Sequence, residues 1–157
     1  MRSPCRLLWM VLIAAAIGLV QAQAKPNFSG TWKMNVGKSE FGPMPALDSR
    51  TDQITHEDPD LKDTTTQSGQ MGEVTAELKY STDGKETTNK IRGNEIKSTA
   101  KWDGDELVIS GKGSFNGADV TLNDHWSISP DGKTITIVRH ASTAMGDADQ
   151  KFILEKQ

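Results

Sequence analysis

Residues 99–110, TAKWDGDELVIS, contain two short runs in which apolar and polar residues alternate. The runs flank Gly104-Asp105, a dipeptide that favours a two-residue hairpin turn. Folding the chain at this turn places Trp102 opposite Leu107, on the same face of an antiparallel strand pair. This stretch therefore predicts a β-hairpin with one apolar face.

Four further turn dipeptides continue the pattern: Asp83-Gly84, Gly93-Asn94, Asn116-Gly117 and Asp131-Gly132. Each favours a tight hairpin and so fixes which residues lie opposite one another. The predicted opposite pairs are Leu78 with Asn89, Tyr80 with Thr87, Ile91 with Ile96, Leu107 with Trp126, and Trp126 with Ile137. The five turns together assign one consistent inner face across six successive strands.

The alternation predicts ten strands and essentially no helix after residue 24. The stretch 37–48 is rich in Gly and Pro and is expected to be a loop. A long meander joined by tight turns closes on itself to remove its exposed edges. We therefore predict an all-β fold: a single up-and-down antiparallel meander closed into a barrel of eight to ten strands. The expected strands lie near 28–35, 50–57, 61–68, 73–81, 85–91, 95–102, 106–113, 118–128, 133–141 and 149–156.

Closure of this barrel would pair its first and last strands. The first strand offers Trp32 and Met34, and the last offers Phe152 and Leu154 on one face. We expect Trp32 to be buried where these strands meet, near one end of the barrel.

The first 24 residues have the organisation of a cleaved signal peptide. Arg2 and Arg6 precede the apolar run 7–20, and Ala22-Gln23-Ala24 forms a small-x-small cleavage pattern. Fourteen apolar residues are too few to span a bilayer of ~30 Å, so we expect no stable membrane insertion. The expected organisation is a signal peptide at 1–24, a barrel domain at 25–157, and a secreted or periplasmic location.

Cleavage would change both the cysteine content and the charge. Cys5, the only cysteine, would be lost, so no disulfide could form in the mature chain. Of the 18 Lys and Arg residues, Arg2 and Arg6 would be removed, which leaves 16 against 21 acidic residues and a net charge of −5. This acidic balance argues against nucleic acid as a partner. We expect a monomer whose partner is a small hydrophobic or amphipathic ligand.

The segment 27–34, NFSGTWKM, resembles the first strand of the calycin superfamily, which contains the lipocalins and the fatty-acid-binding proteins. The ending 152–156, FILEK, is similar to the closing strand of the fatty-acid-binding branch, which also has ten strands. The whole pattern further resembles secreted bacterial proteins described as lipocalin-like. The resemblance implies a barrel around a ligand cavity.

The chain departs from the fatty-acid-binding branch in two places. Phe152 and Leu154 stand where that branch carries an Arg-x-Tyr that grips a carboxylate, and the loop 37–48 replaces its helix pair. The resemblance therefore does not imply a carboxylate-headed fatty acid as the ligand.

The predicted inner face mixes apolar residues with polar and small ones. Gln67, Thr87, Asn89 and Ser98 fall on it, and so do Ala100 and Gly111. Buried polar groups without partners cost ~1–3 kcal/mol each, so they imply partners, water or a ligand. We therefore predict a cavity for a small hydrophobic or amphipathic ligand. The candidate ligand-binding residues are Leu78, Asn89, Ser98, Trp102, Ile109, Asp124, Trp126 and Arg139.

Asp124 and Arg139 lie directly opposite one another in the predicted register, which favours a bidentate ion pair on the inner face. The pair has two interpretations. It is either structural, with Arg139 stacked on Trp32, or it recognises an anionic group of the ligand.

Two other functions compete with ligand binding. A filled barrel could bind proteins through an exposed apolar patch around Phe41, Met44 and Leu47. An enzyme could use His56, which alternation places inward, with haem or a hydrophobic substrate. The histidines show no metal-ligand spacing and the sequence shows no nucleophile–base pair, so we predict no catalytic residue, no metal site and no cofactor.

Overall fold

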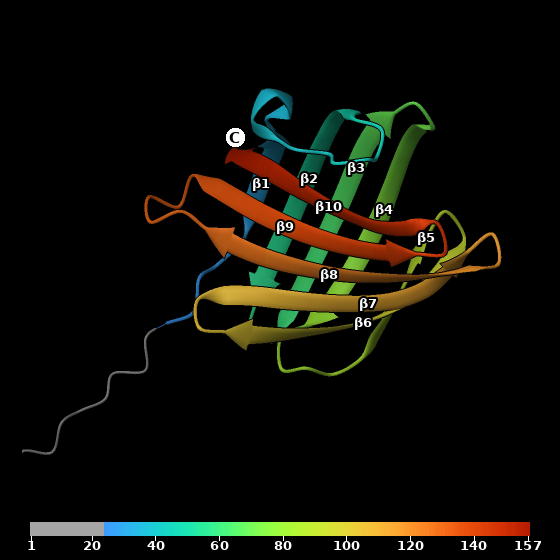
Figure 1. Ribbon diagram of the computed structural model, residues 1–157. Coiled ribbons are helices and arrows are strands. Elements are labelled where there is room, and N and C mark those ends of the chain that lie inside the picture. Colours follow the sequence, from blue (N-terminus) through green and yellow to red (C-terminus); the bar gives the residue numbers. More distant parts are fainter. Residues whose placement is uncertain (1–23) are drawn as a thin grey trace, which may run out of the picture.

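The computed structural model describes residues 24–157, so the predicted signal peptide lies outside the described residues apart from Ala24. Ten antiparallel strands and one three-residue 3₁₀ helix make up the described chain (Figure 1). Their bounds are β1 Gly30–Met34, η1 Val36–Lys38, β2 Leu47–Glu57, β3 Asp60–Gly69, β4 Gly72–Ser81, β5 Thr87–Ile91, β6 Asn94–Asp103, β7 Glu106–Phe115, β8 Ala118–Ile128, β9 Thr134–Thr143 and β10 Gly146–Lys156. All ten predicted strands are present. No helix within 24–157 has the length and apolar content needed to cross a membrane.

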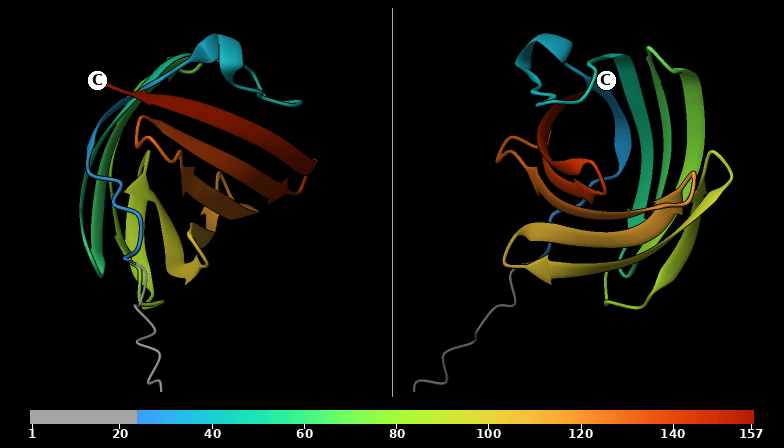
Figure 2. Two further views of the ribbon diagram at one scale, coloured as in Figure 1. Left: turned by 90° about the vertical axis from the view of Figure 1, so that its left-hand side faces the viewer. Right: turned by 45° about the vertical axis from the view of Figure 1, so that its right-hand side comes forward.

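The strands form one sheet in the order β4-β3-β2-β1-β10-β9-β8-β7-β6-β5. Consecutive strands pair with one another, apart from β4 and β5, which form the two edges of the sheet. In addition, β1 pairs with β10. The sheet curls until these edges lie side by side, which gives a nearly closed up-and-down barrel (Figure 2). The predicted all-β barrel is confirmed.

The predicted register holds in the second half of the chain. Trp102 lies opposite Leu107, Leu107 opposite Trp126, and Trp126 opposite Ile137. Leu107, Trp126 and Ile137 are buried and Trp102 is half-buried, so this row faces the interior. The turns at Gly104 and Asn116 form as their sequences predict, and the wider loop around Asp131 keeps the predicted register.

The predicted hairpin at Asp83-Gly84 is wrong. Strands β4 and β5 form no ladder, and β5 begins only at Thr87. The Asp83 carboxylate accepts hydrogen bonds from the Ser81 hydroxyl and the Lys85 N–H, which caps a wider turn. Asp83 also forms an isolated bridge with Lys101. The chain is thereby drawn towards β6 instead of back along β4.

The register predicted at Gly93-Asn94 is displaced by one turn position. Arg92 and Gly93 form the two-residue turn, both with positive φ (51° and 79°), as a type I′ turn requires. Ile91 therefore lies opposite Asn94, and Ile96 opposite Asn89. The displacement changes the partners by two residues, so the predicted inner face is kept.

The two ends of the barrel differ. Phe28 is fully buried at one end, which we call the closed end, and packs against His56, Trp102 and Trp126. The open end carries the loop 35–46 and the turns at 69–72, 91–94, 115–118 and 143–146.

Trp32 lies on β1, where this strand pairs with β10, and is fully buried, as predicted. Its indole N–H donates to the Phe28 carbonyl at 2.9 Å. The pairing of Met34 with Leu154 confirms that the first strand lies beside the last.

Candidate functional site

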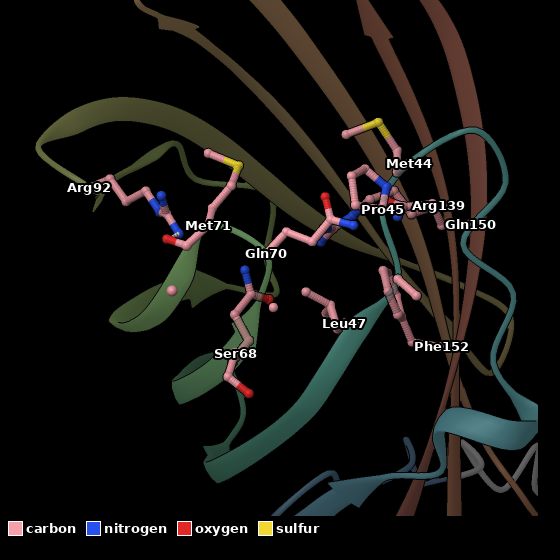
Figure 3. A pocket seen from close by; sticks show the side chains of 14 residues that line it. Met44, Pro45, Leu47, Ser68, Gln70, Met71, Arg92, Arg139, Gln150 and Phe152 are labelled. Carbon is pink, nitrogen blue, oxygen red and sulfur yellow. Dashed lines mark hydrogen bonds between the residues drawn. The ribbon is translucent and has the colours of Figure 1, made fainter.

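A cavity of about 230 Å³ lies at the open end, between the loop 44–47 and the turn 67–72. Its wall is completed from the opposite side of the barrel by Arg139, Gln150 and Phe152 (Figure 3). Its lining mixes apolar residues such as Pro45 and Leu47 with polar ones such as Gln67 and Gln70. We call this the mouth cavity.

Two smaller cavities of about 70 Å³ each lie within the barrel. Leu78, Ile91 and Arg139 line both of them, and Arg139 lines the mouth cavity as well. The three cavities are therefore arranged around one guanidinium group.

Arg139 forms the predicted pair with Asp124. Its Nε donates to Asp124 Oδ1 at 2.8 Å and its Nη2 to Oδ2 at 2.7 Å, the bidentate geometry of a strong ion pair. The two residues are directly opposite on β9 and β8, as predicted. Burial disfavours the charge, but the Asp124 carboxylate outweighs it and holds the pKa of Arg139 above its ordinary value.

A second interior pair, Arg50 with Asp52, lies on β2. Both side chains are almost fully buried, and Arg50 Nε donates to both Asp52 oxygens at 3.1 and 3.0 Å. The guanidinium carbon of Arg50 lies 5.2 Å from the centre of the Phe152 ring, and that of Arg139 lies 5.4 Å from it. Phe152 thus packs against both guanidinium groups. The predicted stacking of Arg139 on Trp32 is wrong, because Lys156 occupies that position at 5.4 Å.

Asp63 is a further ionisable side chain on the inner face. It is fully buried on β3, and neither carboxyl oxygen has a hydrogen-bond partner among residues 24–157. Burial, followed by the nearby Asp52 carboxylate, raises the pKa of Asp63 to about 8. We refer to Arg50, Asp52, Asp63, Asp124 and Arg139 as the interior polar cluster.

Tyr80 and Thr65 border this cluster. Burial, with Asp124 and Asp63 nearby, raises the pKa of Tyr80 above its ordinary value, so its phenol stays protonated. The Thr65 hydroxyl is buried without a partner in the described chain. Tyr80 lines the inner cavity beside Asp124, and Thr65 lines the one beside Arg50.

The eight residues predicted to bind a ligand fall into two groups. Trp102 and Trp126 belong to the aromatic cluster of the closed end, where Trp102 stacks on Phe28 at 6.0 Å. The other six, which line one inner cavity together, are Leu78, Asn89, Ser98, Ile109, Asp124 and Arg139.

Sequence reasoning missed Arg50, Asp52 and Asp63 as a group. The signal was present, because alternation from the inward His56 also places Asp52 and Arg50 inward. Likewise, the predicted inward position of Gln67 implies an inward Asp63. The strand 61–68 is polar on both faces, so its pattern gives no independent direction.

His56 is inward, as predicted, but lies at the closed end and not in a cavity wall. Its Nδ1 accepts a hydrogen bond from the Phe28 N–H at 3.2 Å, and its Nε2 lies 2.7 Å from Asp58 Oδ1. The Thr82 hydroxyl also donates to Asp58. Both ring nitrogens are therefore engaged in holding the closed end together.

The loop over the open end does not form the apolar patch that a filled interaction barrel would need. Phe41 packs edge-on against Phe152 at 6.1 Å, and Leu47 packs against the core, whereas Met44 is half exposed. Within residues 24–157, no group of three or more His, Cys, Asp or Glu is placed to hold a metal ion.

Comparison with solved structures identifies the architecture. A secretory abundant heat soluble protein from Ramazzottius varieornatus matches with a TM-score of 0.60 and 14% identity, over 85% of this chain and 98% of that one. Zebrafish ileal bile acid-binding protein complexed with cholic acid matches with a TM-score of 0.58 and 21% identity, over 83% of this chain and 98% of that one. The fold is a calycin-like ten-stranded barrel.

A second protein from the same organism, secretory abundant heat soluble protein 4, has the same fold, with a TM-score of 0.57 and 14% identity over 87% of this chain and 99% of that one. No family model matches the sequence, and no curated protein matches it significantly. At these identities the likeness concerns the calycin-like fold alone.

Proposed function

We propose that this protein is an exported barrel that binds one small amphipathic molecule inside its open end. The apolar part of the ligand would occupy the mouth cavity, and its polar end would lie against Arg50 and Arg139. The observation that carries the proposal is the position of Arg139, which lines the mouth cavity and both inner cavities. A concave, largely apolar site with a few directed polar groups is the usual form of a small-molecule site.

The comparisons support this proposal at the level of the fold. The zebrafish neighbour is a bile acid-binding protein complexed with cholic acid, an amphipathic molecule. In this chain, the six predicted residues that share one inner cavity give that cavity a mixed polar and apolar wall.

Export is proposed from residues 1–24, with the mature chain beginning at Lys25. Two of the structural neighbours are named secretory proteins, which agrees with this proposal. N-terminal sequencing of the exported protein should give Lys25 as the first residue, and retention of residues 1–24 would refute it. We further propose that the mature protein is a monomer, which light scattering on the purified chain tests.

Binding is tested with Nile red, a neutral dye whose fluorescence rises in an apolar site. We expect saturable binding to the mature protein and loss of binding in Ala46→Trp, since Ala46 lines the mouth cavity and is exposed. Ala144→Trp is the matched control, because Ala144 is exposed on another turn of the open end, outside the residues that line this cavity. Equal dye binding by both variants, or no binding by the unmodified protein, would overturn the proposal.

A further inference from the structure

Two arginines present free hydrogen-bond donors at the cavities, beside the Thr65 hydroxyl, which also has no partner within residues 24–157. Arg50 reaches Asp52 through Nε alone, so its two Nη groups have no hydrogen-bond partner among residues 24–157. Arg139 uses Nε and Nη2 on Asp124, which leaves its Nη1 without one in the same range. Both guanidinium groups line the inner cavity that also contains Thr65. A ligand at this place therefore meets N–H groups that lack acceptors.

The same guanidinium groups offer no net positive charge. Asp52 neutralises Arg50 and Asp124 neutralises Arg139, each through two short contacts. The fifth member of the interior polar cluster, Asp63, adds either no charge or one negative charge. The cluster is therefore neutral when Asp63 is protonated and carries one negative charge when Asp63 is ionised.

An anionic head group would bring an uncompensated negative charge into this low-dielectric interior. Such a charge is strongly disfavoured unless a free cation pairs with it. A carboxylate could accept hydrogen bonds from the free Nη groups, but the charge of each guanidinium is already balanced by Asp52 or Asp124. The charge balance thus argues against a carboxylate ligand.

A cationic head group is disfavoured for a different reason. Asp63 has no ion-pair partner within 24–157, but it is fully buried and is absent from the walls of all three cavities. An ammonium group in the cavity would face the N–H groups of Arg50 and Arg139, which can only donate hydrogen bonds, and would meet only uncharged acceptors on Thr65 and Gln67.

We infer that the cavity selects amphipathic molecules whose head group is uncharged and accepts hydrogen bonds, such as an amide, ester or ketone. This inference rests on the proposed function, and it names the ligand class for that same site. The free Nη groups of Arg50 and Arg139 would donate to the carbonyl oxygen of the head group. The apolar tail would extend past Phe152 into the mouth cavity.

The test uses decanamide, decanoate and decylamine, which share a tail length and differ in head-group charge. The affinity of each compound is measured by its displacement of Nile red from the mature protein at neutral pH. We expect decanamide to bind roughly tenfold more tightly than either charged compound. A tenfold ratio corresponds to about 1.4 kcal/mol, and the burial of a charge without a partner costs more free energy than that. Equal or tighter binding of decanoate or decylamine would overturn the inference. If Nile red itself fails to bind, the proposed function fails, so the two failures are distinguishable.

A variant of the ion pair sharpens this test. Asp52→Asn frees the charge of Arg50, so decanoate should gain roughly tenfold or more in affinity relative to decanamide. Asp48→Asn removes one carboxylate from an exposed position on the same strand and should leave the ratio unchanged. An unchanged ratio in folded Asp52→Asn would contradict the role of that pair. The series on the unmodified protein decides the inference even if Asp52→Asn does not fold.

Discussion

The side chain of Asn89 binds the backbone of Lys79 in the way a neighbouring strand would. Its Oδ1 accepts a hydrogen bond from the Lys79 N–H at 2.7 Å, and its Nδ2 donates to the Lys79 carbonyl at 3.0 Å. This pair of bonds crosses the gap between β4 and β5, where the ladder is absent. One amide side chain thus joins the two edges of the sheet at a point that also borders an inner cavity.

Replacing Asn89 with Ala should loosen this junction. Two hydrogen bonds to part-buried backbone groups are lost, and a lost bond that leaves a fully buried group unsatisfied costs ~1–3 kcal/mol. We expect a fall at the lower end of that range, about 1 kcal/mol, in the free energy of unfolding, and faster hydrogen exchange at the Lys79 amide. Thr88→Ala, at the exposed neighbouring position, is the control. Unchanged exchange at Lys79 would show that the gap is held by other contacts.

The Asp124–Arg139 pair can be tested by single and double replacement. Asp124→Ala or Arg139→Ala should each cost ~3–5 kcal/mol if the remaining charge is left buried. Asp124→Leu combined with Arg139→Met removes both charges and should cost much less. Urea unfolding of the three variants gives these values. A double variant as unstable as the two single variants added together would mean that the two residues act independently and would contradict the expected coupling of the pair.

Asp63 should make stability depend on pH. Its pKa is raised from 3.8 to about 8 in the folded protein. At a pH between these two values, the folded state therefore keeps a proton that the unfolded state has lost. The stabilisation is complete below the unfolded pKa, and stability then falls as pH rises, by at most about 1.4 kcal/mol per pH unit from this group. Above the folded pKa the fall stops.

Asp63→Asn isolates this effect, because an amide of the same shape cannot ionise. The variant should lose the part of the decline between pH 4 and 8 that Asp63 causes, so the stability difference between the two proteins should widen with pH. Chemical unfolding at several pH values measures it. Parallel curves would show that Asp63 is ionised in the folded state throughout.

Trp32→Ala should destabilise the barrel by ~3–5 kcal/mol, the usual cost of deleting a large buried aromatic side chain. Trp32 is fully buried, and its indole N–H is bonded to the Phe28 carbonyl. Trp32→Phe keeps most of the buried area and should cost clearly less. A loss below ~1 kcal/mol for the alanine variant would contradict the burial of this ring.

Local signals in the sequence predict most of this fold. Alternation and turn dipeptides fix the ten strands and the row from Trp102 to Ile137, because both depend only on residues close together in the chain. The gap beside β4 was missed because Asp83-Gly84 has the composition of a tight turn. What differs there is the bonding of the Asp83 side chain to Ser81 and Lys85, which the dipeptide does not reveal.

The candidate site was less predictable than the fold. The opposition of Asp124 and Arg139 follows from register, but the packing of Arg139 on Phe152 depends on barrel curvature and side-chain reach. The clustering of Arg50 and Asp63 with that pair joins β2 and β3 to β8 and β9, across the interior. Alternation gives the direction of each side chain and not the distance between facing walls.

The pairing of β1 with β10 has a consequence for how the chain folds. Met34 lies opposite Leu154, and the N–H of Gln157 donates to the Thr31 carbonyl at 2.9 Å, so strands from the two ends of the domain complete the barrel together. Such distant contacts form late and slow the folding of β proteins. During synthesis β1 has no partner on this side until β10 has emerged from the ribosome. The barrel therefore cannot close before its last strand has been made.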